Sequence, residues 1–179
     1  MNLVRKYIIK TGVKYGITGS IIIVLFYAAL LFFDKNIFFP ALLLLAGLMI
    51  ILIILFSIIE YNQIDIAPRF WKYMSVGIIC NFVISLVFFL SMVIIIKFVR
   101  PELREEYVEN RTAMMMEYKQ NYVEKFGEEH FDLLLEDVEN TSDMALALDG
   151  PIKASFSGFF FVILFSLVFY LIRNKSNRP

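Results

Sequence analysis

The chain has little of the chemistry that most catalytic and metal sites need, because it holds one cysteine and one histidine among 179 residues. The single cysteine, Cys80, excludes an internal disulfide. His130 stands among acidic residues, but neighbouring helical positions point in different directions and cannot converge on one metal ion. No nucleophile motif, phosphate loop or dinucleotide fingerprint occurs, and no basic patch favours nucleic acid. We therefore expect no enzymatic activity, no cofactor, no metal and no nucleic-acid partner.

Apolar residues, in contrast, make up 59% of the chain, the mean hydropathy is +0.71, and the formal net charge is zero. Four apolar runs cover about residues 15–33, 37–59, 73–96 and 154–172, and none contains Asp, Glu, Lys, Arg or His. Each run is about as long as the ~20 residues with which a helix crosses a bilayer. Because hydrocarbon offers the backbone no hydrogen-bond partners, each run must be helical. The sequence predicts an all-α membrane protein with four transmembrane helices in a lipid bilayer.

The runs divide the chain into three parts. Residues 1–100 hold the first three helices, and residues 151–179 hold the fourth helix and a basic tail. Residues 101–150 carry 14 of the 17 acidic residues and only four basic ones. We expect this acidic segment to be a helical insertion outside the cytoplasm, between helices three and four. We also expect it to close at Asp149-Gly150-Pro151, where the chain re-enters the membrane.

Apolar residues recur at helical spacing within the acidic segment, with acidic residues on the opposite face. Gly127 interrupts the pattern, which predicts a helical hairpin or a set of short helices. The stripe must be buried against something, so it is the candidate interaction surface. Its members are Leu103, Tyr107, Met114, Tyr118, Tyr122, Phe131, Leu134 and Leu135.

Basic residues indicate the orientation of the chain in the membrane. They gather before the first run, between the second and third runs, and after the fourth. The residues are Arg5, Lys6, Lys10, Lys14, Arg69, Lys72, Arg173, Lys175 and Arg178. Since positively charged short segments stay in the cytoplasm, we expect both termini to be cytoplasmic.

Two lines of small or polar residues recur every fourth position: Gly12, Gly16 and Ser20 at the start of the first expected helix, and Gly77, Asn81 and Ser85 in the third. Small residues at this spacing let membrane helices approach closely, either within the chain or against a second copy of it. Packing within the chain is the simpler interpretation, and a homo-oligomer stays open. Asn81 is the most polar side chain deep in any run, and it either binds a neighbouring helix or lines a polar path.

In order along the chain, these parts resemble a bacterial family known as domain of unknown function 4199, found in Bacteroidetes. The resemblance rests on Lys14-Tyr15-Gly16, on the charged connection 60–72, on the segment from Lys97 through Arg100-Pro101-Glu102 to Tyr107, and on the ending Arg173-Asn174-Lys175. It implies the four-helix architecture and a bacterial inner (plasma) membrane. It implies no activity and assigns no functional residues.

The function that we expect is therefore a non-enzymatic scaffold or interaction subunit. Its acidic segment, residues 101–150, would contact a partner protein or pack over the helix bundle. The alternative is a small transporter or channel subunit with a polar path near Asn81.

Overall fold

The computed structural model describes residues 3–35, 37–65 and 69–176, and all elements within them are helices. They are α1 (Leu3–Phe32), α2 (Pro40–Ile64), α3 (Phe70–Ile94), a π-helical turn (Ile95–Val99), α4 (Leu103–Glu117), α5 (Lys119–Phe126), α6 (Glu128–Glu139) and α7 (Asp143–Ser176). Among the described residues, four helices are long and apolar enough to cross a membrane: α1, α2, α3 with its π-helical turn, and α7. The predicted all-helical chain with four such helices is confirmed. Arg178, which contributed to the expected orientation, lies outside the described residues.

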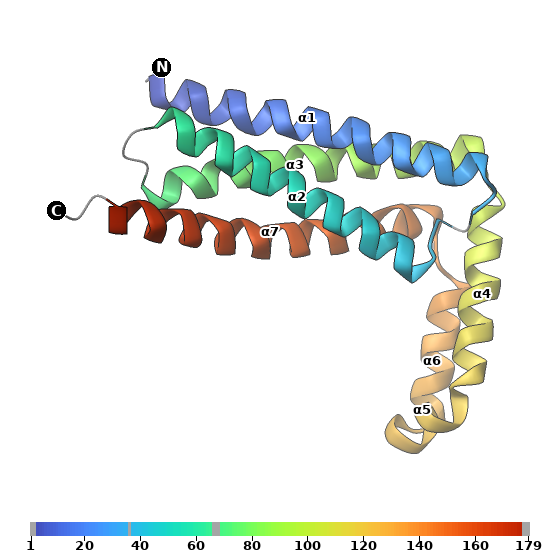
Figure 1. The fold of residues 1–179 in the computed structure, drawn as a ribbon. Helices are drawn as coiled ribbons and strands as arrows, with labels where there is room; N and C mark the ends of the chain where they lie inside the picture. The colour runs from blue at the N-terminus through green and yellow to red at the C-terminus, as the bar shows by residue number, and fades with distance from the viewer. Residues whose placement is uncertain (1–2, 36, 66–68, 177–179) are drawn as a thin grey trace. The chain divides into compact units, whose positions relative to one another are not determined.

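The chain forms two compact units. We call Met1–Phe89 with Gly150–Pro179 the bundle unit, in which α1, α2, α3 and α7 run side by side (Figure 1). Its interior is apolar, with Ile23, Ile54, Ile84 and Val162 fully buried. Its outer surface is apolar as well, as expected of helices that face lipid on one side and each other on the other.

Leu90–Asp149 form the second unit, which we call the hairpin unit. In it α4 lies beside α6, with α5 at the far end of the pair (Figure 1). Gly127 separates α5 from α6 and has a φ of 87°, a backbone conformation that glycine adopts without strain. The predicted break at this residue is confirmed.

Local sequence explains the ends of several helices. Pro40 opens α2, where its missing N–H is not needed. The end of α1 is closed by two backbone bonds, from Lys35 N–H to Leu30 O at 2.9 Å and from Asp34 N–H to Leu31 O at 3.1 Å. Asp34 takes the left-handed conformation, with a φ of 48°, that this ending requires.

The fourth helix begins earlier than the sequence suggested. α7 starts at Asp143 and Pro151 lies inside it, so no break in the helix marks Asp149-Gly150-Pro151, although the hairpin unit itself ends at Asp149. The Ser142 hydroxyl accepts a hydrogen bond from Ala145 N–H at 3.2 Å and so caps a helix start upstream of the proline. Proline removes one backbone hydrogen bond from a helix without necessarily ending it, and membrane helices tolerate it.

Candidate functional site

Small residues of α1 lie against α3 in the bundle unit. A Cβ added to Gly12 would come within 2.8 Å of Ile79, and one added to Gly16 would come within 2.6 Å of Val83. Ser20 is buried too, but its hydroxyl donates to Gly16 O, 2.7 Å away in the same helix. Gly19 is a third close-packed position, which the every-fourth-residue pattern missed because it faces Ile53 and Ile84 instead.

The polar line of α3 lies against α7. Gly77 meets Val162, and Asn81 Nδ2 donates to Ser155 O at 3.0 Å. Gly158 leaves room for the Asn81 amide, because any Cβ at this position would overlap Asn81 Oδ1. The Ser85 hydroxyl is buried and has no hydrogen-bond partner among the described residues. Asn81 thus connects two helices, and Gly158 is the neighbour that the sequence pattern did not reveal.

Polar contacts join the N-terminal half of α1 to the end of α2, and the end of α2 to the start of α3. Lys14 Nζ lies 2.5 Å from Glu60 Oε2, which also accepts a hydrogen bond from the Tyr15 hydroxyl at 2.9 Å. Nearby, Asp65 accepts hydrogen bonds from Tyr61 at 2.9 Å and from Lys72 at 2.8 Å. The structure therefore brings together two segments that carried the family resemblance, Lys14-Tyr15-Gly16 and the connection 60–72.

In the hairpin unit, folding buries part of the apolar stripe. Leu103 and Phe131 are fully buried, and Tyr107, Tyr122, Leu134 and Leu135 are partly buried. Folding of the hairpin unit therefore covers Leu103 and Phe131, so these two members of the candidate interaction surface are not available to a partner. Met114 and Tyr118 remain exposed, and they are joined by Met116, Phe126 and Leu133, which the stripe did not include.

Aromatic side chains pack where α5 meets α6. The Tyr122 ring lies 5.0 Å from Phe126 and 6.3 Å from Phe131, while the His130 ring stacks on Tyr122 at 6.4 Å. Lys119 Nζ lies 5.1 Å above the Phe131 ring. These contacts assign His130 to an aromatic cluster, and the described residues contain no group of three or more potential metal ligands.

A groove of about 620 Å³ runs along α4. Three exposed carboxylates line it, Glu105 and Glu109 from α4 and Glu139 from α6, together with Val108 and Ala113. The Thr112 hydroxyl also lines the groove, and it is buried without a hydrogen-bond partner among the described residues.

Two arginines make hydrogen bonds that hold the start of the hairpin unit together. Arg104 Nε donates to Thr141 O at 2.6 Å, so this cation holds the end of α6 to α4. Arg100 pairs with Glu102 at 3.0 Å and with Glu106 at 2.8 Å. The backbone N–H of Glu102, and then the Arg100 guanidinium, stabilise the Glu102 carboxylate and lower its pKa below the ordinary value. Three carboxylates and one guanidinium, that of Arg104, line the groove, so the formal charge of its lining is negative.

Four membrane-crossing helices and a helical hairpin define this chain as a multi-pass helical membrane protein. The sequence profile of the family described as "Protein of unknown function (DUF4199)" matches residues 11–173, and the chain belongs to this family. The resemblance drawn from its motifs is thereby confirmed. No curated protein and no solved structure matches the chain.

Proposed function

We propose that this protein is a non-enzymatic interaction subunit of a bacterial inner membrane, with both termini in the cytoplasm and the hairpin unit on the opposite side. In this proposal the groove along α4 binds a basic segment of a partner protein. The observation that carries it is the set of three carboxylates, Glu105, Glu109 and Glu139, around one groove.

The chemistry of the groove selects its occupant. A lysine or arginine side chain in the groove would meet several carboxylates at once, and charge-assisted hydrogen bonds are about twice as strong as neutral ones. Val108 and Ala113 offer apolar contacts beside them, and Thr112 offers a hydroxyl that lacks a partner among the described residues. Anionic lipid headgroups would be repelled, so a protein segment fits better than a membrane surface.

The exposed apolar residues of α4 extend the surface. Met114 and Met116 lie near the end of this helix, and flexible methionine side chains adapt to partners of varied shape. The proposed partner therefore carries basic residues next to apolar ones.

The experiment has two steps. First, a photo-crosslinking residue at Ala113, which is exposed in the groove, is compared in cells with one at Gln120, which is exposed outside it. Second, the partner captured at Ala113 is titrated against purified protein bearing Glu105→Gln and Glu109→Gln. Glu117→Gln with Glu124→Gln is the matched control, since it removes the same charge from exposed positions outside the groove.

We expect the groove variant to lose affinity about tenfold or more, because each charged hydrogen bond contributes about 1.5–3 kcal/mol. We expect the control variant to lose less, and wild-type binding to weaken with added salt. Equal losses in both variants would mean that net charge alone attracts the partner, and the groove would then have no specific role.

The transporter alternative has weaker support from the geometry. Asn81 donates to the backbone of α7, and Gly158 of the same helix packs directly against its amide oxygen. Both observations favour a packing role over a polar path, and an Asn81→Ala variant separates the two, as set out below.

A further inference from the structure

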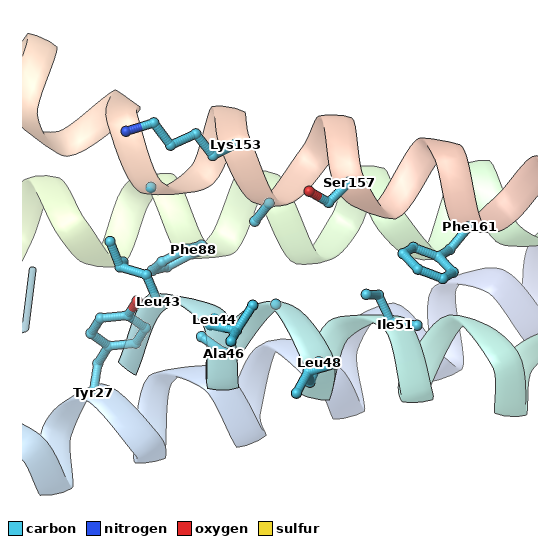
Figure 2. Close-up of a pocket in the computed structure, with 13 residues that line it drawn as sticks. Tyr27, Leu43, Leu44, Ala46, Leu48, Ile51, Phe88, Lys153, Ser157 and Phe161 are labelled. Atoms are coloured by element: carbon cyan, nitrogen blue, oxygen red, sulfur yellow. The ribbon is translucent and has the colours of Figure 1, made fainter. Parts of the chain in front are cut away.

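A cavity of about 320 Å³ lies in the bundle unit between α2 and α7. Its walls come from the stretch of α2 between Leu43 and Ile51 and from the stretch of α7 between Gly150 and Phe161 (Figure 2). Tyr27 of α1 and Phe88 of α3 complete the lining. At 1.5 Å per helical residue, the α7 wall is roughly 16 Å long.

The cavity opens on the apolar surface of the bundle. Leu44 and Leu48 line it, yet they are 68% and 50% exposed. A molecule dissolved in the bilayer can therefore enter from the side. The cavity is too small to enclose a helix, since a cylinder ~10 Å wide and ~16 Å long needs roughly 1,200 Å³.

Polar side chains are few: Tyr27 and Lys153 lie at one end of the cavity, and Ser157 lies between that end and Phe161. Figure 2 shows Tyr27, Phe88 and Lys153 together at that end, with Ile51 and Phe161 at the other. Tyr27 is 1% exposed, its ring lies 4.9 Å from that of Phe88, and its hydroxyl has no hydrogen-bond partner among the described residues. A buried hydroxyl without a partner is costly, which points to a hydrogen-bonding ligand in the cavity it lines.

Lys153 adds a cation at the same end. It directly precedes the apolar run 154–172, so it lies at the depth where lipid headgroups begin. The site thus combines an apolar cavity with a hydroxyl donor and a cation at one end, which suits an amphiphile with an anionic head.

We propose that this cavity binds one acyl chain of an anionic phospholipid. The chain lies along the apolar walls toward Phe161, the Tyr27 hydroxyl donates to the ester carbonyl, and the Lys153 ammonium attracts the phosphate. The volume is at the lower end of the range of small-molecule pockets, which suits a single chain.

Gly47 provides a clean test of occupancy. It lines the cavity, and a Cβ added there meets nothing within 4 Å, so Gly47→Leu places a side chain in the cavity with no clash at Cβ. Ala29→Leu is the matched control, because Ala29 is exposed on α1 and does not line the cavity. Both variants are purified in detergent, and binding of phosphatidylglycerol is measured by native mass spectrometry and by the thermal shift that the lipid causes.

We expect wild type and Ala29→Leu to bind phosphatidylglycerol equally and Gly47→Leu to bind it at least tenfold more weakly. Glycerol phosphate, which is the headgroup without chains, should cause no shift. Equal binding by all three proteins would overturn the proposal, as would a shift with glycerol phosphate. A change of oligomeric state in Gly47→Leu would also overturn it, because the occupant would then be a second copy of the chain.

The polar end is tested separately. Lys153→Gln should remove the preference for phosphatidylglycerol over phosphatidylethanolamine with the same chains, whereas Lys35→Gln, an exposed lysine outside the lining, should keep it. Tyr27→Phe should weaken both lipids about fivefold while the lipid-free protein unfolds at the same or a higher temperature. If both lysine variants keep the preference, or if Tyr27→Phe binds both lipids like wild type, the assignment of the head end is wrong.

Discussion

Replacing Gly77 by alanine should weaken the packing of α3 against α7. The added Cβ would lie 2.8 Å and 2.9 Å from the two Cγ atoms of Val162, which is fully buried and cannot move aside freely. Gly47→Ala is the matched control, since it adds the same methyl group to another membrane-spanning helix where nothing lies within 4 Å.

The expected magnitude follows from two opposing effects. Alanine favours a helix over glycine by up to about 1 kcal/mol at either position. At Gly77 the overpacked contact costs about 1–3 kcal/mol in addition. Gly77→Ala should therefore be less stable than Gly47→Ala by about 1–3 kcal/mol.

Val162→Ala should rescue the variant, because it removes both Cγ atoms and leaves only Cβ, 3.3 Å from the added methyl group. Alone, Val162→Ala loses two methyl groups, at about 0.8 kcal/mol each. The double variant should be more stable than the sum of the single effects by about 1–2 kcal/mol, within the range for contacting residues.

Cys80 supplies the assay. It is the single cysteine and is fully buried, so a thiol-reactive dye reports unfolding in mild detergent. If Gly77→Ala and Gly47→Ala unfold at the same temperature, α3 and α7 do not pack at the distance described. If the double variant is simply additive, Val162 is not the residue that Gly77 accommodates.

Two further predictions concern the alternative function and the topology. Asn81→Ala should lower the unfolding temperature, because it removes the hydrogen bond to Ser155 O. The variant should leave ion and solute flux in proteoliposomes unchanged. Normal stability with altered flux would favour a polar path instead. The topology is tested in a Cys80→Ser background with an impermeant maleimide. Asn121→Cys should react once the outer layers of the cell are permeable and the inner membrane is still intact. Gln63→Cys should react only after the inner membrane is opened. The reverse pattern would contradict the proposed orientation.

The sequence by itself determined the class of the protein. Each of the four charge-free runs of about 20 residues must form a helix in hydrocarbon, because a helix satisfies its own backbone hydrogen bonds. This requirement involves only residues close together in the sequence. The break at Gly127 was likewise readable, because a backbone conformation at positive φ depends on the residue that adopts it. The start of α7 was not readable from the sequence. The Ser142 cap favours a helix that begins before Pro151, whereas Pro151 favours a break, and the sequence does not show which effect is larger.

Only the tertiary structure decided which side chains meet. Glu60 joins Lys14 across 46 positions, and Arg104 reaches the carbonyl of Thr141 across 37, and no periodicity encodes such pairs. Burial also divided the apolar stripe, because folding of the hairpin covers Leu103 and Phe131 and leaves Met114 and Tyr118 exposed. The groove along α4 and the cavity at Tyr27 are spaces between helices, so their shape depends on how side chains from several helices pack together.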